Sequence, residues 1–324
     1  MSAVTWDDVR GARERIAAHA HRTPVLTSTV INRLCDARVF FKCESFQKTG
    51  SFKFRGALNA VASLASEERA RGVYAHSSGN HAQALALAAR IHGIPAHIVM
   101  PENSSPIKVA ATKGYGARVV FCSSTHEGRR EVAARVGEET GAAFVHPHDD
   151  PRVIAGQGTA ICELIEEVGA LDVILAPVGG GGLLSGTSVA AMQLAPRARL
   201  IGCEPAGADD AYRSLQAGRR ITEFTPHTIA DGLRTPLGQN TFAILREHVD
   251  RIILVSESEI LDAMRTVWSR MKIIVEPSSA VAVAPLLAGA VGAKGKRIGV
   301  IVSGGNVDLS RFFADLEGRV AAPA

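Results

Sequence analysis

The feature that most constrains the fold of this chain is an alternation of short β-branched runs with alanine-rich segments of helical spacing. The runs are AHIVM ending at Met100, ARVVF ending at Phe121, DVILA at 172–176, RLIGC at 199–203, RIILV at 251–255 and RIGVIV at 297–302. Such continuous apolar runs are typical of strands that are buried on both faces. The segments between them, such as HAQALALAARIHG from His81, have helical spacing. The pattern therefore predicts an α/β protein with open, mostly parallel sheets flanked by helices.

The chain is long enough for two lobes. Its 324 residues exceed the usual single-domain size of ~100–200. Turn-rich breaks lie near Ala70–Val73 and His146–Pro151, and no linker separates the parts. We therefore expect a large domain built from residues 1–70 and 150–324, with a small domain, residues 71–149, inserted into it.

Composition excludes several classes of function. The 28 arginines and 8 lysines are spread among 32 acidic residues without a basic run, which argues against nucleic-acid binding. No apolar stretch approaches the ~20 residues needed to cross a bilayer, and the N-terminus lacks the apolar core of a signal peptide. Five cysteines without a CxxC pair indicate neither a disulfide framework nor a zinc ribbon. We expect a soluble cytoplasmic protein.

A candidate nucleophile lies in the motif Ser51-Phe52-Lys53-Phe54-Arg55-Gly56, which leads into a helical segment. Ser51 is expected to be the N-cap, which places Lys53 in the first helical turn. There the helix dipole and the flanking phenylalanines lower the pKa of the ammonium, and a neutral lysine attacks carbonyl groups. The alternative is an ordinary solvated lysine, which apolar neighbours on both sides disfavour.

Two further motifs are candidate anion sites, because each joins a predicted strand to a helix. Ser77-Ser78-Gly79-Asn80-His81 offers hydroxyl and backbone N–H groups to a carboxylate, although a simple capped helix start has the same pattern. Gly179, Gly180, Gly181 and Gly182 let the backbone close around a phosphate. A dinucleotide site competes with this interpretation, since Glu204 follows the next strand, but GxGxxG is not matched.

The last apolar strand ends in Ser303-Gly304-Gly305-Asn306. Open α/β sheets present residues to a ligand at such strand ends, although a plain strand-to-helix turn is the alternative. A hydroxyl at Ser303 would hydrogen-bond a pyridine nitrogen without protonating it. That arrangement favours elimination over transamination.

In this order and over essentially the whole chain, the motifs resemble fold-type II pyridoxal-phosphate (PLP) enzymes. The resemblance is to the serine racemase and threonine (serine) dehydratase family, with its tryptophan-synthase-beta-like, two-lobed fold. The matching blocks are SFKFRGA, SSGNHAQA, AGQGT, GGGGLLSG, EPAGADDAY, TIADG, EPSSA and SGGNVD.

The resemblance implies a role for each motif. Lys53 binds PLP covalently, Gly179 to Gly182 hold its phosphate, and Asn80 and Ser303 contact the ring. The side chains that line the ring are Phe52, Leu183 and Glu276. The substrate is received by Ser77, Ser78, Gly79, His81 and Arg129, and Ser78 is also the acid/base on the face opposite the lysine.

The same resemblance implies a divalent cation, Mg²⁺ or Ca²⁺, held by Glu204, the Ala208 carbonyl and Asp210. From the residues alone, a solvated acidic turn is the favoured interpretation of this segment, and the resemblance reverses that preference. His146 and His148 lack metal-ligand spacing and are expected to be structural. Lys48, Gln83 and Tyr115 match positions of nucleotide contacts in eukaryotic racemases.

The implied activity is that of an ammonia-lyase, which converts L-serine or L-threonine to pyruvate or 2-oxobutanoate plus ammonia. Serine racemisation with side lyase activity and L-threo-3-hydroxyaspartate dehydration are the alternatives, and the family implies a homodimer. A β-replacement enzyme is a further alternative within the same fold. Two rivals differ in class: a nicotinamide-binding oxidoreductase and a non-catalytic amino-acid-binding module. The presence of Lys53 in its motif argues against the last.

Overall fold

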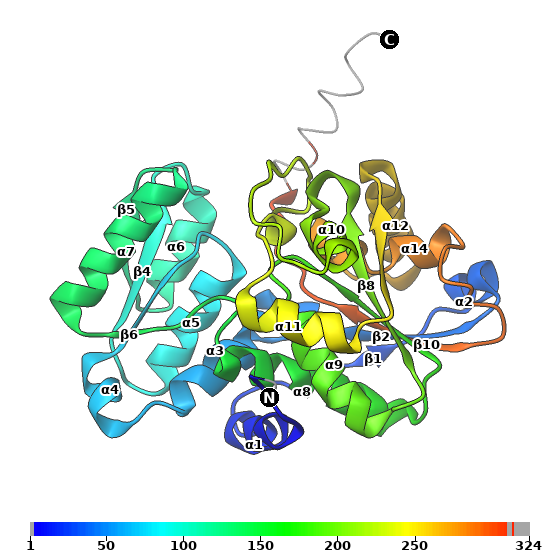
Figure 1. Ribbon diagram of the computed structural model, residues 1–324, viewed down its shortest axis with the longest axis horizontal. Helices are drawn as coiled ribbons and strands as arrows, with labels where there is room; N and C mark the ends of the chain where they lie inside the picture. Colours follow the sequence, from blue (N-terminus) through cyan, green and yellow to red (C-terminus); the bar gives the residue numbers. More distant parts are fainter. Residues whose placement is uncertain (1–2, 310–312, 314–324) are drawn as a thin grey trace, which may run out of the picture.

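The computed structural model describes residues 3–309 and residue 313, and it contains two sheets with helices on their faces (Figure 1). The six-stranded sheet has the order β1-β2-β10-β7-β8-β9, and the four-stranded sheet has the order β5-β4-β3-β6. Every neighbouring pair is parallel except β1 with β2. The expected class, an α/β fold with mostly parallel sheets, is confirmed.

The strands of the larger sheet are β1 Val25–Leu26, β2 Arg38–Cys43, β7 Val173–Pro177, β8 Arg199–Pro205, β9 Arg251–Val255 and β10 Arg297–Val302. Those of the smaller sheet are β3 Val73–His76, β4 Ala96–Pro101, β5 Arg118–Cys122 and β6 Ala143–Phe144.

The helices before the glycine motif are α1 Trp6–Ile16, α2 Thr29–Cys35, α3 Lys53–Ala62, α4 Ser66–Arg71, α5 Asn80–Ile91, α6 Pro106–Gly114, α7 His126–Thr140 and α8 Pro151–Val168. Those that follow are α9 Gly182–Leu194, α10 Asp210–Ala217, α11 Gln239–His248, α12 Glu257–Met271, α13 Pro277–Ala280 and α14 Ala284–Leu287. Short 3₁₀ turns are η1 Glu44–Phe46, η2 Lys48–Gly50, η3 Ala206–Ala208 and η4 Asp231–Leu233. In the described residues, none of these helices is both long and apolar enough to cross a membrane.

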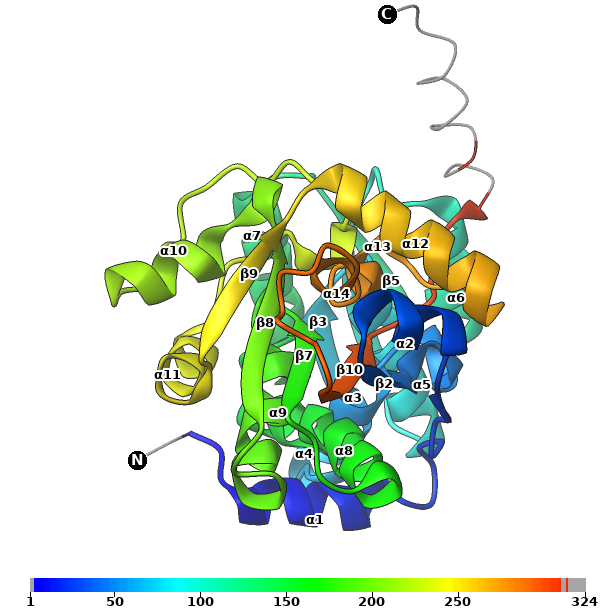
Figure 2. The same cartoon turned by 90° about the vertical axis from the view of Figure 1, so that its right-hand side faces the viewer.

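The six-stranded sheet has an apolar core on each face. Along β7, Val173 and Leu175 point into one cluster with α12, α13 and α14. Ile174 and Ala176 point into the other with α8, α9 and α11. In Figure 2, α8 and α9 lie below the strands and α12 lies above them. Because successive side chains of a strand alternate between faces, a sheet covered on both sides needs strands that are apolar at every position. This requirement explains the continuous apolar runs in the sequence.

Helix α3 lies between the two sheets (Figure 1). Its Phe54 and Leu58 belong to the same apolar cluster as α5 and β4 of the smaller sheet. On its other side it meets α8 so closely that a Cβ on Gly156 would lie 2.6 Å from the Gly56 Cα. Since both lobes pack against α3, they jointly fix the position of Lys53, its first residue. The boundaries of the inserted domain at residues 71 and 149 stay a prediction.

Candidate active site

Lys53 projects from the first turn of α3. Its Nζ donates a hydrogen bond to the Pro147 carbonyl at 2.7 Å and lies 5.2 Å from the centre of the Phe52 ring. Burial disfavours the ammonium form and lowers the pKa of Lys53 to about 8, although the Glu276 carboxylate acts in the opposite direction. A substantial fraction of this amine is therefore neutral near physiological pH, as a nucleophile toward a carbonyl must be.

The expectation that Ser51 caps this helix is wrong. The N-cap is Phe52, which makes no side-chain capping bond. Ser51 is extended and forms a bridge with Gly304, and the Phe52 amide donates to the Ser303 carbonyl at 2.9 Å. Strand-like pairing with the end of β10 therefore replaces the cap, and Lys53 still occupies the first turn.

The Ser77-Ser78-Gly79 turn connects β3 to α5. The Gly79 amide donates to Ser77 Oγ at 3.3 Å. Asn80, at the start of α5, donates from Nδ2 to both Glu276 oxygens at 2.9 and 3.1 Å, and it accepts from Asn306 through Oδ1 at 2.9 Å. These bonds hold the turn of one lobe against the end of β10 in the other.

Glu276 is a buried carboxylate at this junction, 3% exposed. Burial raises the pKa of Glu276 to about 7, and the nearby Asp231 acts in the same direction, while the Asn80 hydrogen bond opposes the shift. The carboxyl group therefore changes charge near neutral pH, within electrostatic reach of the candidate nucleophile.

His81 is a buried neutral imidazole in the first turn of α5. Its Nε2 lies 3.1 Å from the Val145 carbonyl, so Nε2 carries the hydrogen and Nδ1 is left as an acceptor. Among the described residues, Nδ1 has no hydrogen-bond partner. Burial lowers the pKa of His81 to about 3, and Lys53 contributes to the shift. A buried free acceptor near Lys53 is a contact point for a bound molecule.

The four glycines between β7 and α9 form a cradle that larger residues would close. A Cβ on Gly180 would overlap the His148 ring, and one on Gly179 would lie 2.8 Å from the Leu233 Cα. Gly181 has φ +90, where a side chain would be strained. In the described structure, no protein acceptor pairs with the amides of residues 179–184. Free amides at a helix N-terminus fit a phosphate group.

The His146-Pro147-His148-Asp149 segment also borders the site, which sequence reasoning missed. His146 Nδ1 accepts from the Asp149 amide at 3.0 Å, and the His148 ring lies against Gly180. Asp149 accepts from the amides of Gln239 and Thr241 at 2.9 and 3.0 Å, at the start of α11. Burial lowers the pKa of His146 to about 4, so its ring is neutral. The one sequence feature that points to this segment is its position directly after a strand of the smaller sheet, β6.

Ser303 and Leu183 complete the group. Ser303 is buried at the end of β10, with its Oγ 2.9 Å from Ser279 Oγ. Leu183 is buried in the first turn of α9. Together with Lys53 and the glycine cradle, these residues fit pyridoxal phosphate, because an amine, free amides and a hydroxyl match its aldehyde, phosphate and pyridine nitrogen.

Arg129 is not joined to this group by its contacts. It lies on α7, where Nη2 donates to the Ser124 carbonyl at 3.4 Å. Its Nε is buried without a hydrogen-bond partner among the described residues. The side chain therefore has a free donor, but its role in substrate binding stays a prediction.

The acidic segment after β8 brings Glu204, Ala208 and Asp210 together as buried residues. Glu204 accepts from the amides of Ala211 and Tyr212, at 2.9 and 2.8 Å, and so binds the start of α10. Asp210 Oδ1 is buried without a partner, and burial raises the pKa of Asp210 to about 7. The described residues contain no cluster of three or more His, Cys, Asp or Glu side chains with metal-site geometry. Two carboxylates and a carbonyl nevertheless offer the hard oxygens that Mg²⁺ and Ca²⁺ take.

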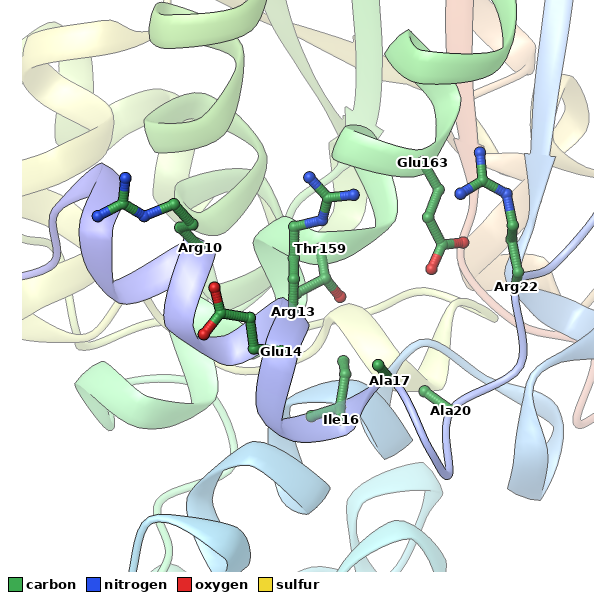
Figure 3. Close-up of a pocket in the computed structure, with 9 residues that line it drawn as sticks. All are labelled: Arg10, Arg13, Glu14, Ile16, Ala17, Ala20, Arg22, Thr159 and Glu163. Atoms are coloured by element: carbon green, nitrogen blue, oxygen red, sulfur yellow. The ribbon is translucent and has the colours of Figure 1, made fainter.

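A separate cavity of about 390 Å³ lies between α1, residues 17–22 and α8, and Lys53 is not among the residues that line it (Figure 3). Its arginines and Glu163 are already paired: Arg10 contacts Asp7, Arg13 and Arg22 both contact Glu166, and Glu163 contacts Lys42 and Arg55. These paired arginines therefore have little free charge with which to bind an anionic ligand.

Comparisons with known proteins agree with this geometry. The family model described as "Pyridoxal-phosphate dependent enzyme" matches residues 16–304. The beta-hydroxyaspartate dehydratase of Paracoccus denitrificans is 48% identical, covering 96% of this chain and 99% of the relative. The serine racemase of Dictyostelium discoideum is 49% identical, and the match covers 96% of this chain and 97% of the relative. The solved structure of the T.th. threonine deaminase superimposes with a TM-score of 0.89 at 46% identity. The superposition covers 94% of this chain and 99% of the deaminase chain.

Proposed function

The chain belongs to the family of pyridoxal-phosphate-dependent enzymes, and on that premise we propose that it is an ammonia-lyase acting on small hydroxy-amino acids. L-Serine and L-threonine would give pyruvate and 2-oxobutanoate, each with ammonia. The observation that supports the proposal is the setting of Lys53, an amine with a pKa of about 8. Its Nζ binds the Pro147 carbonyl, next to the His148 ring that lies against Gly180, and it acts electrostatically on His81 beyond the Ser77-Ser78-Gly79 turn. The relatives named as dehydratase and deaminase support the same reaction.

Bound pyridoxal phosphate supplies an electron sink that makes the Cα–H bond of an amino acid acidic. The residues of the chain bind the substrate and transfer the proton. Backbone groups of the Ser77-Ser78-Gly79 turn bind the substrate carboxylate, and the Lys53 amine accepts the Cα proton as general base. Loss of the β-hydroxyl as water yields 2-aminoacrylate from serine, which takes up water after release and gives pyruvate and ammonia.

Ser78 favours a second activity at the same site, racemisation of serine. A hydroxyl on the face of Cα opposite Lys53 can return a proton there and so invert the centre. Dehydration and racemisation then share the removal of the Cα proton. They differ in the next step, which is loss of the β-hydroxyl in one and return of a proton to Cα in the other. The relative named as serine racemase supports this addition.

A keto-acid assay across L-serine, D-serine, L-threonine and L-threo-3-hydroxyaspartate, with chiral analysis of the remaining substrate, tests the function. Keto acid from at least one L-substrate is the expected result. Its absence with all four, in protein that carries the cofactor, would overturn the proposal.

Ser78→Ala separates the two activities. Racemisation of L-serine should be lost while much of its elimination remains, because removal of the L-substrate proton needs Lys53. Elimination from D-serine should fall, since no second base then lies within the ~3 Å reach of proton transfer. If the variant eliminates D-serine at the wild-type rate, Ser78 only binds the carboxylate.

We also propose that Glu204, the Ala208 carbonyl and Asp210 hold a divalent cation, with the buried unpaired Asp210 Oδ1 as support. The enzyme would be a homodimer, as the family resemblance implies, and would act in the cytoplasm. Analytical ultracentrifugation at micromolar concentration tests the oligomeric state.

A further inference from the structure

One ion pair joins the two lobes beside the active site. Lys108 Nζ, on α6 of the four-stranded-sheet lobe, lies 2.7 Å from Asp231 Oδ2, on η4 of the other lobe. The two residues are 123 positions apart in the chain. The pair therefore arises from the way the lobes meet and not from local structure.

Helix α6 is weakly held by its own lobe. Of its nine residues, Pro106–Gly114, only Thr112 is buried. Val109 is partly buried against the apolar cluster of that lobe, while Ile107 is 64% exposed. Because α6 buries little apolar surface, its own lobe holds it weakly. A single contact with the opposite lobe therefore contributes much to fixing its position.

The partner segment η4 is, by contrast, fixed to the wall of the cofactor cradle. The Gly232 amide donates to Ser278 Oγ at 3.0 Å. The Leu233 Cα lies so close to the glycine motif that a Cβ on Gly179 would approach it to 2.8 Å. The ion pair therefore ties a loosely packed helix to a rigid part of the site.

Both charges act on the interior of the site. Asp231 raises and Lys108 lowers the pKa of Glu276, the buried carboxylate that accepts from Asn80. This opposition places the pair within electrostatic reach of the junction at which the lobes meet over Lys53.

We propose that the Lys108–Asp231 ion pair is a latch that holds α6 against η4 and limits access to Lys53. The inference rests on the proposed function, since Lys53 is the residue assigned there to cofactor and substrate. The side chains of Lys108 and Asp231 are 24% and 47% exposed, so the pair is in contact with solvent. Such pairs are weak, which suits a contact that must open at each turnover.

The holoenzyme offers a direct measure of access, namely the rate at which borohydride reduces the cofactor bound to Lys53, followed by loss of its visible absorbance. Lys108→Met and Asp231→Asn should each raise this rate about two- to fivefold, the range that one exposed ion pair supports. The double variant Lys108→Asp with Asp231→Lys restores opposite charges and should return the rate toward the wild-type value.

Asp262→Asn is the matched control. It breaks the 3.0 Å ion pair with Arg265, which lies within α12 and joins no lobes, so the reduction rate should not change. Raising the salt concentration should accelerate reduction of the wild type more than that of Asp231→Asn, because an exposed pair is screened. With substrate, the two single variants should change KM more than kcat.

Wild-type reduction rates in both single variants would overturn the latch. The latch would also be overturned if the double variant, Lys108→Asp with Asp231→Lys, were reduced by borohydride as fast as the single variants. Reduction does not require turnover, so the two proposals fail separately: a protein inactive on every hydroxy-amino acid can still show the latch, and an active one can lack it.

Discussion

At the scale of single residues, Lys53 derives its predicted reactivity from groups far away in sequence. The Pro147 carbonyl holds its Nζ, and burial between the lobes outweighs the Glu276 charge that would favour the ammonium. Flanking phenylalanines in the sequence point correctly to an apolar setting. They do not reveal the carbonyl partner, because no sequence pattern links positions 94 residues apart.

Lys53→Ala should abolish turnover and the yellow, borohydride-reducible chromophore while the protein stays folded. The reason is that, within the part of the chain that the structure describes, no other amine lies at the glycine cradle to bond the cofactor. Absorbance spectra and circular dichroism give the two readouts, and peptide mapping of the reduced wild type should place the pyridoxyl group on Lys53. Lys113→Ala, at an exposed position, is the control. Finding the pyridoxyl group on Lys272 or Lys113 would remove the assignment.

The pKa of Lys53 predicts how cofactor-free protein regains its cofactor as pH changes. Only the neutral amine attacks the cofactor aldehyde, so the rate should fall about tenfold per pH unit well below a midpoint near 8 and level off above it. Stopped-flow absorbance between pH 6 and about 10 measures this rate. A midpoint near the ordinary lysine pKa of about 10.4 would show that burial does not perturb the amine.

At the scale of elements, the apolar runs predict most of the longer strands well, at the edges of the sheets as well as in their centres. All six predicted runs are strands, with ends that differ from the prediction by a few residues. The same pattern does not predict β2, Arg38–Cys43, because a lysine interrupts its apolar residues. Lys42 is nevertheless completely buried, since Nζ meets the Thr23 carbonyl and Glu163, each at 2.6 Å. A buried charge can be anticipated only when its partner is known.

The acidic segment before α10 gives a prediction for the metal. Removing divalent cations with EDTA should lower the melting temperature, and excess Mg²⁺ should restore it, because Glu204 and Asp210 repel each other without a cation. A site filled at 100 times its dissociation constant contributes about 2.7 kcal/mol. Asp210→Asn should lose the response, whereas Asp209→Asn, its more exposed neighbour, should keep it. Equal melting temperatures of the wild type in EDTA and in Mg²⁺ would favour a plain acidic turn.

At the scale of the whole molecule, a buried ionic network joins segments that the sequence keeps apart. Arg55, fully buried on α3, contacts Glu44 through Nε at 2.7 Å and Glu163 through Nη1 at 2.7 Å. Glu163, on α8, also binds Lys42 of β2. The network fixes α3 two residues beyond Lys53. The sequence shows the motif that contains Arg55, but no pattern in it identifies the two carboxylates that Arg55 contacts.

Arg55→Ala should therefore destabilise the folded protein strongly. The substitution leaves Glu44, which has no exposed surface, without its main positive partner, and an uncompensated buried charge costs about 3–5 kcal/mol. Urea unfolding of the cofactor-free protein measures the loss, and a midpoint shift without a change in slope would show that native stability alone has changed. Arg135→Ala, which removes an exposed guanidinium 3.9 Å from Glu139 on α7, is the matched control and should change stability by no more than about 0.5 kcal/mol. Adding Glu44→Gln to Arg55→Ala should recover part of the loss, since the buried charge is then gone. If Arg55→Ala unfolds like the control, the network does not hold α3 in place, and the position of Lys53 depends on apolar packing against α5 and α8 alone.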